Sequence, residues 1–409
     1  MSWNLMLKTR ADLTFKHNIK RGRHGWLRLT PAYSIKVVHE ILEQHPKVKH
    51  VLDPFSGTGT TGLVCAELGL NCDLIDINPF LIWLARVKTA NYTSAQCLET
   101  KTAANDIAHS LRNASEDNLS FPPIKNIERW WSEHKRVLLA QIHREIHQRF
   151  PAESPSQDLL LIAFCRLIIE WSNAAFNHQS MSFKDNQSLL FETEGRGYLL
   201  SHFENTVHEI IEAATIDVSG NVNVKQADSR DVPLSPNHLY DCVITSPPYP
   251  NRMSYIRELR PYMYWLGYLK EAREAGELDW KAIGGTWGIA TSRVEKWQPN
   301  GVRIKHSGFD KMIGEISEQS KVLANYVHKY FVDAVTHLTS AYQTVAPNGK
   351  VFYIVGNSKF YNTLVPVEDI YVSILKQCGF IDTQTKILRK RNSKKELKEL
   401  VVTARKPCS

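Results

Sequence analysis

The first hundred residues alternate between short strand-like runs and helical runs. Residues 50–55 and Asn71–Asp76 are short and apolar, as strands are, and a helix is predicted between them over residues 60–68. An amphipathic helix is predicted earlier, over Ile35–Glu43. A strand, a helix and a second strand connected in this way have a right-handed crossover, which makes the two strands parallel neighbours. The pattern therefore predicts the start of a parallel α/β sheet.

A long helical stretch then interrupts the alternation. Residues 94–216 carry apolar side chains at helical spacing, for example at Leu138 and Ile142. Strand character returns at residues 221–228 and again at Tyr240–Thr245. This order predicts a helical insertion within one α/β domain rather than two domains lying end to end.

A second interruption covers about residues 271–318, where glycines and scattered Lys and Arg residues predict loop rather than core helix. The alternation then closes with a helix over residues 323–345, a strand over 350–355, a helix over 366–378, and two strands, 381–388 and 400–404, that resemble a hairpin. The predicted fold is α/β, with a doubly wound, mainly parallel, Rossmann-like sheet, a large helical insertion and a second loop-rich insertion. The predicted segments are 1–93 and 220–270 as two halves of the α/β domain, 94–219 and 271–320 as the insertions, and 321–409 as its C-terminal part.

The composition is that of a folded protein. The chain has 409 residues, of which 43% are hydrophobic and 10% aromatic. Fifty Lys and Arg against 42 Asp and Glu give a net charge of +8, which suits a polyanionic partner but is also common in proteins that bind none. The seven cysteines form no C-x-x-C pair, so neither a metal site nor a disulfide framework is expected, and a reducing cytoplasm fits best. No apolar run is long enough to predict a membrane span or a secretion signal.

A glycine-rich turn follows the first predicted strand. Gly57-Thr58-Gly59-Thr60-Thr61-Gly62 is a G-x-G-x-x-G sequence that opens a helix, and Asp76 ends the next strand. In such a turn the glycines let the backbone approach a nucleotide cofactor, while an acidic residue about 20 positions further on holds ribose hydroxyls. Nicotinamide, flavin and S-adenosylmethionine enzymes share this arrangement. The turn therefore predicts a nucleotide-type cofactor without deciding among them.

The tetrapeptide Ser246-Pro247-Pro248-Tyr249 directly follows Tyr240–Thr245. Consecutive prolines supply no backbone donors and have a fixed φ, so a rigid turn presents carbonyl oxygens and the tyrosine ring above the sheet. Together with Asp53-Pro54-Phe55 before the glycines, the tetrapeptide resembles the S-adenosylmethionine-dependent DNA amino-methyltransferases of restriction-modification systems. The motif order is similar to that of the family's alpha group, except that the third strand follows the large insertion.

The resemblance implies a class I methyltransferase fold with S-adenosylmethionine as its cofactor. Asp76 would bind the ribose hydroxyls, Ile77 and Asn78 would flank the adenine, and Asp228 would accept from the adenine amine unless it is an ordinary turn aspartate. Residues 24–34 resemble the family's N-terminal motif, which lies beside the methionine end of the cofactor, although on local grounds they simply start a helix. The residues expected to bind the cofactor are Pro31, Tyr33, Asp53, Phe55, Ser56, Gly57, Thr58, Gly59, Thr60, Asp76, Ile77, Asn78 and Asp228.

The tetrapeptide is the expected catalytic motif. An exocyclic amine of a nucleobase is a weak nucleophile because its lone pair is delocalised into the ring, so acceptors must hold the nitrogen in a more pyramidal state. The resemblance assigns Ser246 Oγ and the Pro247 carbonyl to the two amine hydrogens. Tyr249 would stack on the base after it is rotated out of the duplex, and Pro248 keeps the turn rigid.

The predicted reaction is methyl transfer to N4 of cytosine in double-stranded DNA, because in this family a first-position serine mostly accompanies N4-cytosine. The alternatives are N6-adenine methylation, methylation of RNA or a protein amide, and an inactive DNA-binding module. A dinucleotide oxidoreductase would leave the tetrapeptide unexplained. The large insertion is the candidate target-recognition region, in competition with the second insertion. Arg252, Arg257 and Arg260 are candidates for contacts with phosphates or with the orphaned partner base. In a restriction-modification system, the expected partner is a cognate restriction endonuclease that acts on the same site. The sequence determines neither whether this endonuclease exists nor the oligomeric state of the protein.

Overall fold

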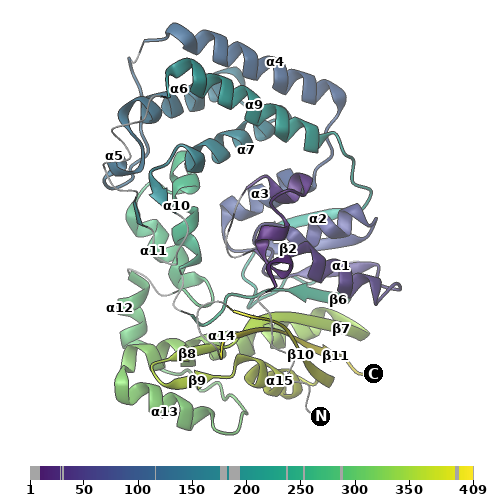
Figure 1. The fold of residues 1–409 in the computed structure, drawn as a ribbon. Helices are drawn as coiled ribbons and strands as arrows, with labels where there is room; N and C mark the ends of the chain where they lie inside the picture. The colour runs from purple at the N-terminus through teal and green to yellow at the C-terminus, as the bar shows by residue number, and fades with distance from the viewer. Residues whose placement is uncertain are drawn as a thin grey trace, which may run out of the picture.

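The computed structural model shows an α/β part with a lobe of helices above it (Figure 1). The residues it describes are 10–27, 29, 32–115, 117–175, 182–183, 194–235, 238–251, 254–285, 289–391 and 396–408. Short 3-10 helices cover Ala11–Leu13, Phe15–His17, Gly22–Gly25 and Leu111–Asn113. No helix in the described part of the chain is both long and apolar enough to cross a membrane.

Seven strands form one sheet in the order β10-β11-β7-β6-β1-β2-β5. The strands from β7 to β5 are parallel to their neighbours, whereas β11 is antiparallel to both β7 and β10. Their bounds are His50–Asp53 (β1), Asn71–Asp76 (β2), Val222–Gln226 (β5), Tyr240–Thr245 (β6), Val345–Gly356 (β7), Ile381–Lys390 (β10) and Lys398–Arg405 (β11). The mainly parallel sheet and the terminal hairpin confirm the fold class predicted from the sequence.

Helices cover both faces of the sheet, as parallel strands require because their side chains are apolar on both sides. Val51 and Leu52, adjacent on β1, are both fully buried but belong to different cores. Val51 packs with α1 and α2, and Leu52 packs with α14 and α15. These helices and α3 span Ile35–Glu43 (α1), Thr60–Glu67 (α2), Pro79–Thr89 (α3), Lys321–Thr344 (α14) and Val367–Gln377 (α15). The sheet is therefore doubly wound.

The helical lobe has a core that continues into the α/β part. Its helices are α4 (Ser94–Ser110), α5 (Ile127–Trp130), α6 (Glu133–Arg149), α7 (Pro155–Glu170) and α9 (Arg196–Ala214), with a two-residue strand pair, β3 (Ala174–Ala175) and β4 (Ser182–Phe183). Trp131 is fully buried in this core, and Phe80 of α3 and Trp265 of α10 (Tyr255–Trp265) belong to it as well. The lobe is thus packed onto α3 and α10, both of which lead away from the carboxyl edge of the sheet.

The second insertion differs from its prediction. Where the sequence predicted loop, the structure has α11 (Ala272–Lys281), α12 (Ile289–Lys296) and α13 (Phe309–Gln319). Reciprocal bonds between Glu271 and Glu274 cap α11, and Met312 and Ile316 of α13 are buried against the sheet's helices. The prediction was wrong because glycines and charges between these helices masked their short apolar faces. A small strand pair, β8 (Ser358–Phe360) and β9 (Thr363–Val365), follows β7.

Candidate functional site

The glycines after β1 make a tight turn and bring α2 close to its neighbours. Gly57 has φ +49°, and Gly59 has φ +74° as the residue before α2, a backbone region that favours glycine. A Cβ at Gly59 would lie 3.1 Å from Cβ of Ala85, and a Cβ at Gly62 would lie 2.5 Å from Cδ1 of Leu74. The glycines therefore serve the turn and the packing of α2, and they leave the backbone of the turn uncovered.

Asp53, at the end of β1, is fully buried and lies beneath this turn. Its Oδ1 accepts from Thr245 Oγ1 (2.6 Å) and from the backbone N–H of Phe55 (3.1 Å), while its Oδ2 accepts from Thr61 Oγ1 (2.6 Å) and Tyr33 OH (3.3 Å). Burial raises the pKa of Asp53 above its ordinary value, against these bonds. One carboxylate thus ties together β1, α2, the N-terminal motif and β6.

Asp76, at the end of β2, lies against the glycine turn at Gly57. Its Oδ2 accepts from the backbone N–H of Gly57 (3.0 Å), and its Oδ1 accepts from the backbone N–H of Asn78 (2.9 Å). Burial raises the pKa of this carboxyl group to about 6, although both backbone bonds act in the opposite direction. Asp76 is therefore an ionisable acceptor fixed by its backbone contacts.

Ser246 is the first residue after β6, which lies directly between β1 and β7 in the sheet. Its Oγ donates to the carbonyl oxygen of Ile354 on β7, at 3.2 Å. Because the hydroxyl hydrogen is used in this bond, the oxygen keeps lone pairs that can accept from a ligand.

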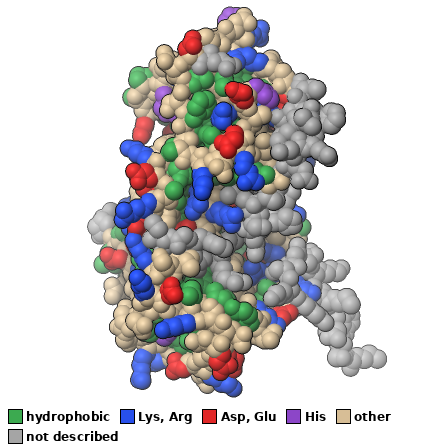
Figure 2. Space-filling view, turned by 90° about the vertical axis from the view of Figure 1, so that its left-hand side faces the viewer, with side chains coloured by type: hydrophobic (Ala, Val, Ile, Leu, Met, Phe, Trp, Pro, Cys, Tyr) green, Lys and Arg blue, Asp and Glu red, His purple; other side chains and the backbone are tan. Residues whose placement is uncertain are grey.

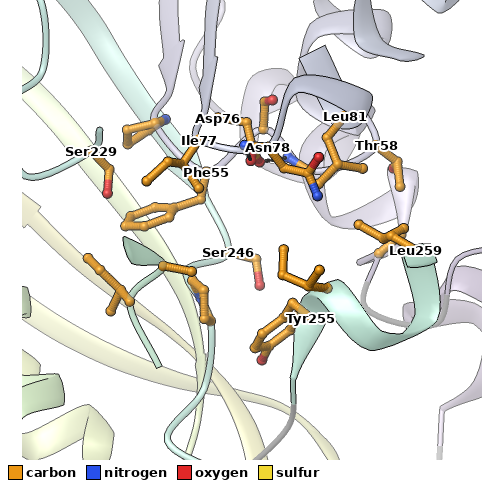
Figure 3. Close-up of a pocket in the computed structure, with 18 of the residues that line it drawn as sticks. Phe55, Thr58, Asp76, Ile77, Asn78, Leu81, Ser229, Ser246, Tyr255 and Leu259 are labelled. Carbon is orange, nitrogen blue, oxygen red and sulfur yellow. Dashed lines mark hydrogen bonds between the residues drawn. The ribbon is translucent and has the colours of Figure 1, made fainter. Parts of the chain in front are cut away.

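One cavity joins the glycine turn to the tetrapeptide (Figure 3). Its free volume is about 130 Å³, and both Ser246 and Asp76 line it. Adjacent parallel strands end at one edge of a sheet, so residues far apart in the sequence meet there. Of the predicted site residues, those that line the cavity are Tyr33, Phe55, Ser56, Gly57, Thr58, Thr60, Asp76, Ile77, Asn78, Asp228, Ser246 and Pro248.

The remaining predicted residues do not line it. Asp53 and Gly59 lie behind the turn, and neither Pro247 nor Tyr249 is among the lining residues. The Tyr249 hydroxyl donates to Oε1 of Glu399 at 3.0 Å, so this ring points toward β11. Pro31 and Arg252 lie outside the described residues.

Asp228 is already paired with a cation. Arg230 Nη2 lies 2.6 Å from its Oδ2, and the Arg230 guanidinium also contacts Asp333. Burial opposes ionisation of Asp228, but the hydrogen bonds and charge of Arg230 outweigh it and lower the pKa of Asp228. The carboxylate is therefore ionised and oriented at this end of the cavity.

Several lining residues were missed by the sequence reasoning. Tyr255, at the start of α10, lines the cavity together with Ser246 (Figure 3); an aromatic residue so soon after the tetrapeptide was the one available signal. Lys281, Ala282 and Ile283 form a wall from the second insertion, and no motif marks them. Arg230 Nη2 donates to the Lys281 carbonyl at 2.7 Å, which attaches this wall to the α/β part.

The cavity has features that fit S-adenosylmethionine. Ser56 Oγ is buried on the cavity wall and has no hydrogen-bond partner among the described residues, so a polar ligand group is the natural partner. Asp76 supplies an acceptor suited to ribose hydroxyls, and Phe55, Ile77 and Ile283 supply apolar surface suited to a purine ring. Within the described residues, no group of His, Cys, Asp and Glu could hold a metal ion.

A family model and several curated proteins are similar to this chain. The model of D12 class N6 adenine-specific DNA methyltransferases matches residues 35–122. The Type II methyltransferase M.BsoBI of Geobacillus stearothermophilus is 22% identical over 95% of this chain and 85% of its own length. M.AvaI of Nostoc is 22% identical over 91% and 82%, and M.MvaI of Kocuria varians is 21% identical over 88% and 82%.

Among solved structures, the rRNA methyltransferase aviRa of Streptomyces viridochromogenes is 12% identical and covers 96% of both chains, with a TM-score of 0.28, which is too low to establish a common fold. The sequence similarities are more informative, since the Type II methyltransferases align over nearly the whole chain. Taken with the mainly parallel seven-stranded sheet, they support a DNA methyltransferase.

Proposed function

We propose that this protein transfers a methyl group from S-adenosylmethionine to N4 of cytosine in double-stranded DNA. The observation that carries the proposal is the shared cavity, in which the glycine turn after β1 and the tetrapeptide after β6 face the same space. A cofactor site and an amine-binding motif are both needed for such a transfer, and they must be adjacent.

The cofactor would lie between the turn and the second insertion. We assign Asp76 to the ribose hydroxyls, Ser56 to a polar group of the methionine end, and Asp228 to the adenine amine. When bound, S-adenosylmethionine supplies an electrophilic methyl group on a sulfonium centre. The protein's own task is to orient the donor and to exclude water, for which the wall from Lys281 to Ile283 is suited.

The acceptor amine would be held at Ser246. Its Oγ gives its hydrogen to the Ile354 carbonyl, so it can accept one amine hydrogen. The family resemblance assigns the other amine hydrogen to the carbonyl of Pro247, which does not line the cavity itself but stands between two residues that do, Ser246 and Pro248. Two acceptors on one amine draw its hydrogens out of the plane of the ring and return electron density to the nitrogen. After methyl transfer the nitrogen carries an extra proton, which can leave to water.

The choice of cytosine rests on the first residue of the tetrapeptide, since serine there mostly accompanies N4-cytosine in the family that the sequence resembles. The family model for adenine-specific enzymes matches residues 35–122, which include the glycine turn but end before Ser246. The match therefore bears on the cofactor half of the site rather than on the base. N6-adenine methylation is the second candidate, because the same acceptors could hold that amine.

Double-stranded DNA is the proposed substrate because the chain carries a net charge of +8 and is similar to Type II methyltransferases. Figure 2 shows Lys and Arg side chains gathered at mid-height of one face, between the helical lobe and the lower part of the molecule. Arg257 and Arg260 of α10 are half-buried, so part of each side chain is open to solvent, and we keep them as candidates for DNA contact. A cognate restriction endonuclease would act on the same site.

The test is transfer from labelled S-adenosylmethionine to mixed-sequence duplex DNA, with the modified nucleoside identified by mass. We expect N4-methylcytosine, sharply reduced in Ser246→Ala. Ser201→Ala, on the exposed surface of α9, is the matched control and should be unchanged. N6-methyladenine would overturn the base assignment, and cofactor binding without transfer to DNA would shift the proposal to RNA or protein amides.

A further inference from the structure

Two tyrosines lie near Ser246, and the structure gives them different surroundings. Tyr255 lines the cavity together with Ser246 and Pro248, whereas Tyr249 is not among the lining residues. In Figure 3 the Ser246 hydroxyl is directed toward the part of the view in which the Tyr255 ring is drawn, and both residues line the cavity. Tyr255 therefore presents aromatic surface to the cavity that Ser246 lines, whereas Tyr249 approaches Ser246 with its hydroxyl, which lies 3.5 Å from Ser246 Oγ.

The ring of Tyr249 is occupied by contacts within the protein. A Cβ at Gly356 would lie 2.8 Å from its Cδ2, so the ring packs directly on the backbone of β7. The guanidinium carbon of Arg391 is 5.4 Å from the ring centroid, and the hydroxyl is bound to Glu399. These contacts hold the Tyr249 ring against β7, Arg391 and Glu399, and Tyr249 is not part of the cavity lining.

Tyr255 is fixed in place before any substrate binds. Its hydroxyl accepts from the backbone N–H of Tyr249 at 2.8 Å, which ties the ring to the tetrapeptide. Ser254 caps the N-terminus of α10 and donates to both carboxylate oxygens of buried Asp279, at 2.9 and 2.8 Å. The ring therefore has a defined orientation, which lowers the cost of binding a flat ligand against it.

The geometry points to Tyr255 as the residue whose ring stacks on the target base when its amine is held at Ser246, with Tyr249 anchoring the tetrapeptide to β11. This inference rests on the proposed function and deepens it. Stacking on an aromatic side chain depends on the ring and not on the hydroxyl, whereas a purely structural role would depend on the bond between Tyr255 and Tyr249.

The two roles separate in a series of substitutions at residue 255, assayed with mixed-sequence duplex DNA and saturating S-adenosylmethionine. Tyr255→Phe and Tyr255→Trp keep a ring and lose the hydroxyl, so we expect kcat/KM for DNA within about fivefold of the parent, the effect of one hydrogen bond. Tyr255→Leu and Tyr255→Met lose the ring, so we expect a loss of about 10- to 100-fold. Cofactor affinity, measured by calorimetry, should stay near the parent value in all four.

The inference would be overturned if the phenylalanine variant lost as much activity as the leucine variant, or if all four retained activity. Tyr249→Phe serves as the comparison, because it removes the hydroxyl that contacts Glu399 and Ser246 and keeps the ring. If the parent protein methylates no DNA, the proposed function fails instead. Should one aliphatic variant not fold, as judged by circular dichroism and cofactor binding, the other decides.

Discussion

Replacing Asp53 by asparagine should weaken the fold far more than it weakens cofactor contacts. The carboxylate accepts four hydrogen bonds and is fully buried, but it does not line the cavity. An asparagine has the same shape but only one acceptor oxygen. Because the backbone N–H of Phe55 cannot rotate away, the new amide group should face Thr61 and Tyr33, whose hydroxyls then lose their bonds to the carboxylate. Among the described residues they keep only their contact with each other and the weaker bond from Thr61 Oγ1 to the Ile244 carbonyl (3.3 Å).

Two hydrogen bonds to a charged acceptor would be lost, each contributing about 1.5–3 kcal/mol. Removing a buried charge offsets part of this loss, since burial already disfavours the ionised form and raises its pKa. We therefore expect the free energy of unfolding to fall by about 2–4 kcal/mol in Asp53→Asn. The assay is urea unfolding of the protein without cofactor, followed by circular dichroism.

Asp76→Asn is the matched comparison, because Asp76 is also buried beside the glycine turn but lines the cavity and accepts only two bonds within the protein. It should unfold within about 1–2 kcal/mol of the parent and lose most of its affinity for S-adenosylmethionine. If Asp53→Asn instead unfolds like the parent but binds cofactor at least tenfold more weakly, Asp53 contacts the cofactor and the structural argument is wrong.

Three further predictions follow from single residues. Burial raises the pKa of Asp76 to about 6, so its carboxylate is protonated as the pH falls through 6. Calorimetry should therefore show constant cofactor affinity from pH 8 to 7 and a decline below pH 6. A flat profile would contradict the assignment of Asp76 to the ribose hydroxyls. Arg23 donates to backbone carbonyls at the ends of α3 and α9, so Arg23→Met should lower the free energy of unfolding by about 2–4 kcal/mol, measured as a lower urea midpoint. An unchanged midpoint would mean that water satisfies those carbonyls. Gly62→Ala should destabilise the protein by about 1–3 kcal/mol, because the new Cβ would meet Leu74 at 2.5 Å. Gly197→Ala, on a helix with open space around it, should stabilise the protein by up to about 1 kcal/mol. Equal thermal midpoints for these two variants would refute the packing argument.

The sequence by itself determined the elements whose signals are local. The bounds of α1, β2 and β6 are those predicted, because amphipathic spacing and short apolar runs depend only on neighbouring residues. The glycine turn was also predicted correctly, because Gly59 has the positive φ that such a turn requires. The rigidity of the tetrapeptide stays a prediction from its two adjacent prolines. The three helices between residues 271 and 320 were missed because their apolar faces are short and are completed only by packing against the rest of the molecule.

Only the tertiary structure decided which of these residues meet. Strand order placed β6 beside β1, so Ser246 faces the turn that begins nearly two hundred positions earlier in the chain. Burial turned Asp53 into an internal anchor and left Asp76 on the cavity wall, although both residues end a strand. Packing directed Tyr249 toward β11 and Tyr255 toward the cavity, and it brought Lys281 to Ile283 to the cavity wall. These outcomes depend on contacts between distant segments, and no local pattern specifies such contacts because each is fixed by the packing of the whole fold.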